Sequence, residues 1–473
     1  MSSAPEESPG RNPAERMSRD QRVILVIAVL ASFVAFLDGT VVNVALPAIR
    51  NELGGGLATQ QWVVDAYLIT LGALILVAGS ISDAYGRVLV LRLGLIGFGA
   101  ASIAVAAAPT AEFLIVARAL QGAAGALLVP SSLALITSTF RGVAQGRAIG
   151  VWTAMTTTAM IAGPVIGGVF VDLLSWRLAF LINVVPIAIT LWLLTRTRVR
   201  DVRRPDASVD WLGAVLCTAG LGTVVFALIE QPRLGWQSAA IWLPLAGGSI
   251  LFILFIIRQR RVRNPILPLD LFTVRNFWTG NVATFFIYGA LALNGFVVAV
   301  YLQQSAGLSA TLAGLASLPS TVLLIVLSSR VGAVAARIGP RLFMTVGPLL
   351  MGAGALLLLT VSLDFSYWWQ VLPSMVLSGF GLALMVAPLT TTILGSIDTE
   401  RSGIASAVNN AVSRVAGLVT IALLATIVGG ALDLEGFHRA AIATAIFMFA
   451  GGVVSFFGIR NTQIHHDARQ TGL

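Results

Sequence analysis

Residues 36–50 read FLDGTVVNVALPAIR and place the carboxylate of Asp38 inside an apolar run that extends from about residue 22 to residue 49. At about 1.5 Å of rise per residue, Asp38 lies roughly 24 Å from the start of this run and 16 Å from its end, which is within hydrocarbon. An ionisable group at that depth usually faces a bundle interior and marks a path for protons or substrates. The alternative is a neutral Asp38 that only hydrogen-bonds a neighbouring helix. Pro47 frees the carbonyl of Asn43, so this helix is expected to bend there.

The composition is that of an all-α integral membrane protein. Apolar residues make up 57% of the 473 residues, charged residues only 11%, and the mean hydropathy is +0.90. Soluble proteins contain about 25% charged residues. The apolar runs are continuous over about 20 residues, which is typical of membrane-spanning helices and not of alternating β-barrel strands. The net charge of +9 comes from basic residues between the runs, where they indicate orientation and not nucleic-acid binding.

Fourteen spans are predicted from the apolar runs. They cover about 22–49, 60–82, 88–108, 111–136, 146–171, 177–196, 211–230, 238–257, 277–303, 310–336, 341–362, 367–396, 402–430 and 438–459. Arginines concentrate in every second loop, starting with the amino-terminal segment, and an even number of spans returns the chain to the same side. The positive-inside rule therefore places both termini, the polar tails 1–21 and 460–473, in the cytoplasm.

The chain is predicted to divide into two six-helix bundles, residues 22–196 and 277–459. The linker 197–276 adds an extra helix pair at about 211–230 and 238–257. The halves echo each other, because GSISDAYGR (Gly79–Arg87) follows the second span and GAVAARIGPR (Gly332–Arg341) stands at the equivalent place in the second half. Two such halves indicate a rocking transporter with its site between them.

Three further charged residues inside predicted spans are candidates for a functional role. Asp65 and Arg118 both occupy the outer halves of their spans, with Gln121 one turn beyond Arg118, so they could share a cavity with Asp38. The alternative is a structural ion pair between Asp65 and Arg118. Arg414, in the thirteenth span, needs a partner that the sequence does not identify.

Two glycine-containing motifs predict close helix contacts. Gly79 and Gly86 flank Asp83 and Arg87 in a short cytoplasmic turn, which would otherwise be an ordinary positive-inside loop. In the fifth span, Gly163, Pro164, Gly167 and Gly168 combine a kink with tight packing, although any closely packed membrane helix could show this pattern.

Other chemistries are not supported by the residues present. The three histidines lie at span ends or in the tail, so no buried metal site is predicted. There is no glycine-rich loop ending in Lys-Ser or Lys-Thr for ATP. No cofactor is expected, and the spans lack the clustered nucleophile, base or metal ligands that a membrane-embedded lipid-modifying enzyme needs.

Taken together, these motifs resemble the major facilitator superfamily, and more closely its 14-span drug:proton antiporter branch of the EmrB/QacA type. LDGTVVNVALP, GSISDAYGR, RALQGAAGALLVP (Arg118–Pro130) and GPVIGG are similar to that branch's motifs. So are Trp176, Arg177, Phe180, Asn183 and Pro186, the segment Tyr301–Pro319, and Asn409–Gly417. The sequence departs from the pattern at Val88 and Val415, where a basic residue and glutamine are usual.

The resemblance implies a proton-coupled efflux antiporter in a bacterial plasma membrane. Asp38, Asp65 and Arg118 are the expected proton-coupling residues, and the loop motif is the expected conformational switch. The substrate is expected to be a lipophilic compound. It is expected to be a cation, because the carboxylates of Asp38 and Asp65 would attract a positive charge in an apolar cavity. The residues expected to line the substrate cavity are Asn43, Trp62, Tyr67, Gln121, Asn294 and Tyr301. Export of an endogenous metabolite, lipid or self-made antibiotic, and a non-transporting sensor on the same fold, remain alternatives.

Overall fold

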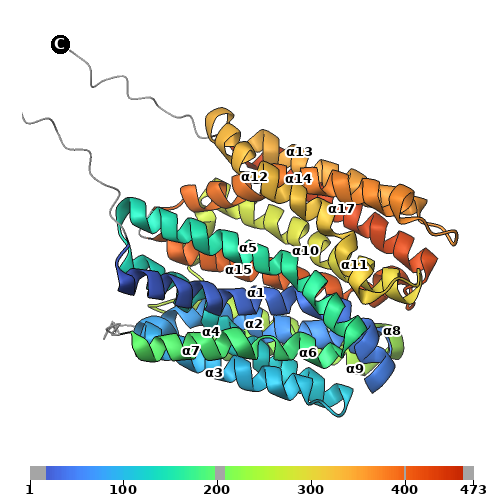
Figure 1. The fold of residues 1–473 in the computed structure, drawn as a ribbon, viewed down its shortest axis with the longest axis horizontal. Coiled ribbons are helices and arrows are strands. Elements are labelled where there is room, and N and C mark those ends of the chain that lie inside the picture. Colours follow the sequence, from blue (N-terminus) through green and yellow to red (C-terminus); the bar gives the residue numbers. More distant parts are fainter. Residues whose placement is uncertain (1–16, 198–207, 399–400, 462–473) are drawn as a thin grey trace, which may run out of the picture.

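The computed structural model describes residues 17–197, 208–398 and 401–461 (Figure 1), and every regular element in these ranges is helical. Residues 1–16 and 462–473 of the predicted tails, and residues 198–207 of the loop predicted at 197–210, lie outside the described residues. The first half of the chain contains α1 (Arg19–Leu53), α2 (Leu57–Tyr85), α3 (Arg87–Ala106), α4 (Ala111–Thr139), α5 (Gly142–Leu173), α6 (Trp176–Leu181) and α7 (Val184–Arg196). The middle contains α8 (Trp211–Leu234), α9 (Ala239–Gln259) and η1 (Leu269–Thr273). The remainder contains α10 (Arg275–Gln304), α11 (Ala310–Ala316), α12 (Leu318–Ile338), α13 (Arg341–Leu357), η2 (Leu358–Thr360), η3 (Tyr367–Val371), α14 (Leu372–Gly395), α15 (Ser402–Ala422), α16 (Leu424–Val428) and α17 (Leu434–Gly458).

The helices form 14 segments that are long and apolar enough to cross a membrane, which confirms the predicted number of spans. Helices α6 and α7 together form one span, and α11 and α12 form another. The largest difference in boundaries is in the thirteenth span, which was predicted to reach residue 430. There α15 ends at Ala422 and the short helix α16 follows. The apolar run continues through α16, so hydropathy alone does not reveal this break.

Local sequence explains where the first helices begin and end. The hydroxyl of Ser18 accepts from the amide of Gln21, and the Gln21 side chain accepts from the amide of Ser18, which is a complete capping box at the start of α1. Gly86 has a φ of 106° and ends α2 while α3 starts at the next residue. A residue with a side chain rarely adopts this conformation, so glycine is needed at this turn.

The helices pack into two groups with α8 and α9 beside them (Figure 1). Helices α1–α7 pack on one another, and so do α10–α17. Helix α8 packs on α2 of the first group and on α15 and α16 of the second. The apolar side chains of α8 join Ile69 and Ala73 of α2 to Leu418 and Ala422 of α15 in one cluster. The extra helix pair therefore covers the seam between α2 and α15. The domain boundaries at residues 196 and 277 remain a prediction.

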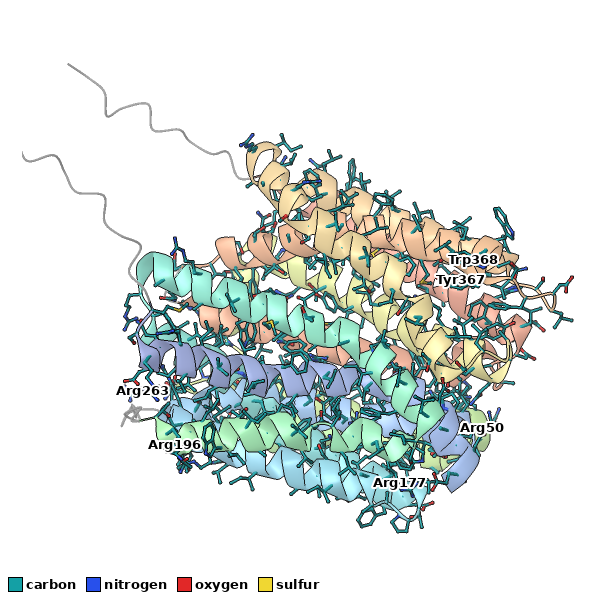
Figure 2. The ribbon with its side chains drawn as sticks, in the orientation of Figure 1. Arg50, Arg177, Arg196, Arg263, Tyr367 and Trp368 are labelled. Carbon is teal, nitrogen blue, oxygen red and sulfur yellow. The ribbon has the colours of Figure 1, made fainter. Side chains whose placement is uncertain are left out.

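The two ends of the bundle are distinguished by where the chain begins and ends. Figure 2 shows Arg196 and Arg263 at one end and Arg50 and Arg177 at the other. We call the first the terminal end, because α1 begins there and α17 ends there, and the second the distal end (Figure 1). Which end faces the cytoplasm remains a prediction from loop charge.

The two halves hold each other at the distal end. The carboxylate of Asp172, at the end of α5, accepts hydrogen bonds from the backbone amides of Ala310 (2.9 Å) and Thr311 (2.8 Å) at the start of α11. Arg50 of α1 donates to Gln304 of α10 over 2.9 Å. A buried apolar cluster at this end contains side chains from both halves, including α1, α2, α10 and α11. The structure is therefore closed at its distal end.

Candidate functional site

Asp38 is held in a fully buried polar network within the first half. Its Oδ2 accepts a hydrogen bond from Nη1 of Arg118 at 2.6 Å, and the two side chains form an ion pair with no exposed surface. Its Oδ1 accepts from Nε2 of Gln121 and from Nδ2 of Asn183, each at 2.9 Å. Gln121 also donates to the hydroxyl of Ser102 at 2.9 Å. Both carboxylate oxygens of Asp38 are thus occupied.

Four elements bring this network together. Asp38 comes from α1, Ser102 from α3, and Asn183 from the link between α6 and α7. Arg118 and Gln121 lie three residues apart on α4, so they share one face of that helix, and Arg118 donates to Gln121 at 2.7 Å. The network consequently ties most of the first half to a single carboxylate.

Arg118 is also bound to α2. Its Nε donates to the carbonyl of Val63 at 3.1 Å, and its guanidinium carbon lies 4.3 Å from the centre of the Tyr67 ring. A Cβ at Gly122 would collide with the carbonyl of Tyr67, so glycine is required for α4 to approach α2 this closely. Nη2 of Arg118 and Oδ1 of Asn183 are buried without a hydrogen-bond partner in the described residues. The network therefore has one donor and one acceptor left for a rearranged state.

Asp65 lies apart from this network, contrary to the prediction that it shares a cavity with Asp38. Its side chain is fully buried, and neither carboxylate oxygen has a hydrogen-bond partner within the described ranges. The alternative of an ion pair between Asp65 and Arg118 is also wrong, because Arg118 pairs with Asp38. An isolated ionised carboxylate in such surroundings is strongly disfavoured, so the neutral acid is the form that fits here.

Sequence reasoning missed two members of the network. Asn183 belonged to a motif that carried the resemblance but was given no role, and its position 145 residues after Asp38, in the sixth span, offered no signal of contact. Ser102 is the one serine in α3, and a single serine in a membrane-spanning helix gave no signal of a role in the site. Asp38, Arg118 and Gln121 were all singled out, although Gln121 was expected in the substrate cavity and not in hydrogen bonds with Asp38 and Ser102.

The six predicted cavity residues do not form one site. Tyr67 and Gln121 belong to the network around Arg118. The indole of Trp62 donates to Glu230 of α8 at 3.1 Å, which turns it toward the extra helix pair. Tyr301 stacks on Phe437 with ring centres 4.1 Å apart.

The remaining two, Asn43 and Asn294, lie on α1 and α10, which pack together, and both are half-buried. Tyr301 lines a cavity of about 240 Å³ at the distal end of the second half, together with Ser305 and Asp433.

Among the described residues there is no group of three or more His, Cys, Asp and Glu side chains that could hold a metal ion.

The loop motif is formed by an ion pair and a helix contact. Arg87 pairs with Asp83 at 3.5 Å and donates to the carbonyl of Ala134 in α4 at 3.2 Å. The expected close approach at Gly79 is wrong, because no atom lies within 4 Å of where its Cβ would be. Gly86 is buried, and its φ of 106° is a conformation that glycine adopts without strain.

The GPVIGG motif places its glycines against two different helices. A Cβ at Gly163 would collide with Thr40 of α1, and one at Gly167 would press on Val41 of the same helix. A Cβ at Gly168 would lie 2.6 Å from the carbonyl oxygen of Ala310 in α11. The motif therefore packs α5 on α1 and, at Gly168, closes the distal contact between the halves.

Arg414, which the sequence left without a partner, lies between the halves. Its guanidinium carbon is 5.7 Å from the ring centre of Phe36 in α1, and its Cβ is 3.4 Å from the Cβ position of Gly72 in α2. Nε of Arg414 is buried and has no acceptor among the residues described. A second cation thus stands near the first-half network without a carboxylate of its own.

Known proteins similar to this chain are transporters. Residues 28–421 match the family model for the Major Facilitator Superfamily. The methylenomycin A resistance protein of Bacillus subtilis is 32% identical over 407 residues, which cover 86% of this chain and 87% of that protein. The puromycin resistance protein pur8 of Streptomyces alboniger is 34% identical over 419 residues, with 86% and 82% covered.

A crystal structure of the peptide transporter POT in complex with sulfate has a TM-score of 0.67 and 14% identity, covering 92% of this chain and 93% of that one. At this identity the likeness shows the fold alone. The two bundles, the 14 spans and the family match agree with one another. The chain belongs to the major facilitator superfamily, in its 14-span branch of drug and antibiotic exporters, and is a transporter and not an enzyme.

Proposed function

We propose that this protein exports a lipophilic drug or antibiotic in exchange for protons, and that Asp38 carries the proton. The observation that supports this most strongly is the buried ion pair between Asp38 and Arg118. Two charges enclosed within a helix bundle are expensive to desolvate, and apolar side chains of the same size would often stabilise the fold as well. Stability alone does not explain why this position holds an ion pair and not two apolar residues, so the pair points to a functional role.

Protonation of Asp38 would act on the whole first half. A neutral Asp38 no longer balances the charge of Arg118, and loss of one partner from a buried pair typically costs about 3–5 kcal/mol. Because Gln121 and Asn183 donate to the same carboxylate, their hydrogen bonds weaken together. Helices α1, α4 and α6 would then repack, and this repacking would accompany opening of the distal end.

The direction of transport follows from the predicted orientation. With both termini in the cytoplasm, the distal end faces outward, and the structure corresponds to a state closed to the outside. One proton entering per cycle supplies about 1.36 kcal/mol per pH unit and about 2.3 kcal/mol per 100 mV of membrane potential. That is sufficient for a useful outward gradient of substrate.

The cationic substrate expected from the sequence stays a prediction, but the reasoning behind it loses support. It required Asp38 and Asp65 to face a shared cavity, whereas both side chains are fully buried and lie in separate surroundings. The charge of the substrate must therefore be argued from other residues.

The proposal is tested by proton movement in inside-out vesicles with an acidified interior. Addition of a transported drug should release protons, which a pH-sensitive dye reports, and Asp38→Asn should abolish this release because the side chain can no longer bind a proton. The matched control is Asp364→Asn, the same substitution at an exposed loop position. Proton release that persists at the wild-type rate in Asp38→Asn would rule out Asp38 as the coupling residue.

A further inference from the structure

Arg414 occupies the middle of α15 and faces the first half across the seam between the bundles. It lies twelve residues after Ser402, where α15 begins, and eight before Ala422, where it ends. Its neighbours across the seam are Phe36 of α1 and Gly72 of α2. Because these neighbours belong to the opposite half, the partly exposed side chain of Arg414 faces the space between the halves and not lipid.

The acids closest to this region are not available to neutralise Arg414. Both oxygens of Asp38 are occupied within the first-half network. Neither carboxylate oxygen of Asp65 has a hydrogen-bond partner among the described residues, so Asp65 is not bonded to Arg414. With the pair of Asp38 and Arg118 counted as neutral, the centre of the described membrane region carries one uncompensated positive charge at Arg414.

Aromatic side chains lie on the side of this charge that faces α1. Phe36 lies edge-on to Trp152 of α5, with ring centres 6.4 Å apart, and both are half-buried. Tyr288, which is likewise half-buried, lies on α10, and α10 packs on α15. Elements of both halves thus contribute a positive charge and an aromatic wall to the same region.

We propose that Arg414 is the charged anchor of the substrate site, and that the exported compound is a lipophilic organic anion with a carboxylate or phenolate beside an aromatic body. This inference rests on the proposed export function and specifies its substrate class. The free Nε–H of Arg414, next to an Nη group, offers the parallel pair of donors that a carboxylate accepts in bidentate fashion. The aromatic rings bury the remainder of the compound.

The charge of the substrate also determines how transport responds to membrane potential. Exchange of one exported anion for one imported proton moves two positive charges inward per cycle. The equivalent exchange of a cation moves none. An inside-negative potential should therefore accelerate export of an anion and leave one-for-one cation export unchanged.

The binding experiment compares two fluorescent probes on the purified full-length protein: dansyl-leucine, a lipophilic carboxylate, and ethidium, a lipophilic cation. The wild type should bind dansyl-leucine at least tenfold more tightly than ethidium. Arg414→Gln should weaken dansyl-leucine binding at least tenfold and leave ethidium binding unchanged, whereas Arg414→Lys should retain most of the affinity. Arg92→Gln makes the same change at an exposed position on α3 and should have no effect.

A third probe makes the test independent of any variant. The methyl ester of dansyl-leucine lacks the negative charge, so the wild type should bind it at least tenfold more weakly than the acid. Equal affinity for acid and ester, tighter binding of ethidium than of the acid, or unchanged binding of the acid to Arg414→Gln would each overturn the proposal.

Failure of this proposal can be separated from failure of the exporter mechanism, because binding requires no proton movement. If Asp38→Asn keeps proton release while Arg414→Gln loses the carboxylate probe, the coupling proposal fails and the substrate proposal stands. If Arg414→Gln binds both probes normally but loses proton release, Arg414 belongs to proton coupling and the substrate proposal is wrong.

Discussion

The two halves of the molecule have related helix arrangements but handle buried polar groups differently. In the first half, Asp38 and Arg118 form an enclosed ion pair with neutral hydrogen-bonding neighbours. In the second half, the amide of Asn409 in α15 donates to Asn281 at 3.2 Å and to Thr284 at 2.9 Å, both of them in α10. This second network contains no charge among its members. One half therefore holds a group that can bind a proton, and the other is joined by uncharged hydrogen bonds.

Arg414 is an exception to this difference between the two networks, because it is a half-buried charge that comes from the second half. It belongs to the second half, on the same helix as Asn409, but its guanidinium lies close to Phe36 of the first half. The first half thus holds the proposed proton site, which is enclosed together with its own counter-charge, and the second half holds a charge without a partner. Under the two proposals, proton binding and substrate binding would influence each other through the seam without competing for one carboxylate.

The largest effect is expected from breaking the ion pair of the first half. Asp38→Leu alone leaves the charge of Arg118 buried without a partner, so the free energy of unfolding should fall by about 3–5 kcal/mol. Arg118→Met alone should cost a similar amount. The double variant Asp38→Leu/Arg118→Met should recover most of the loss, because apolar residues of similar volume replace both charges. Denaturant unfolding of the purified protein in detergent measures all three.

Strict additivity of the two substitutions would contradict this expectation. It would mean that Asp38 and Arg118 do not interact energetically. Proton release should be absent in the double variant even though its stability is recovered, which separates the role of the pair in coupling from its role in folding.

The sequence predicted the architecture better than the contacts. The 14 spans could be recognised because each membrane helix must be apolar over about 20 residues, and Asp38 and Arg118 stood out because charges are rare in such runs. Their partnership could not be recognised, because 80 residues separate them and the facing sides of two helices are not encoded by hydropathy. The same limitation led to the incorrect pairing of Asp65 with this group.

Motif resemblance had a similar limit. It identified GPVIGG but did not show that Gly163 contacts α1 while Gly168 contacts α11. Trp62 was predicted to line the substrate cavity, whereas its indole donates to Glu230 of α8. The extra helix pair has no equivalent in a 12-helix arrangement, so only the tertiary structure shows that α8 covers the seam between α2 and α15.

A medium effect is expected in the uncharged network. Asn409→Leu removes the donor to Asn281 and Thr284, whose side chains are almost fully buried. A buried polar group left without its partner costs about 1–3 kcal/mol, so the free energy of unfolding should fall by that amount. Proton release at Asp38 should continue, because this network carries no charge.

The neighbouring variant Asn410→Leu is the matched control and should change stability by less than about 0.5 kcal/mol. Loss of proton release in Asn409→Leu, with the protein still folded, would show that the two halves do not divide their tasks as the contrast implies.

The smallest effect is expected from an exposed ion pair that joins η1 to the start of α15. Asp270 in η1 pairs with Arg401 at 2.6 Å, with 60% and 42% of the side chains exposed. The hydrogen bond from Arg401 and the charge of its guanidinium lower the pKa of Asp270, against a smaller opposing effect of burial. Because the pKa is lower in the folded state, the stabilisation is present above the ordinary aspartate pKa and is lost as the pH falls through the folded value.

Exposed pairs contribute about 0.2–1 kcal/mol, so Asp270→Asn should lower the free energy of unfolding by no more than this at pH 7. The difference from the wild type should shrink as the pH falls below about 4, where the unfolded-state aspartate is protonated. In 1 M salt, where the Debye length is about 3 Å, the effect of Asp270→Asn should largely disappear while that of Asp38→Leu persists. Equal salt sensitivity of the two substitutions would show that water and ions reach Asp38. The proposal that Asp38 is an enclosed proton site in this state would then be wrong.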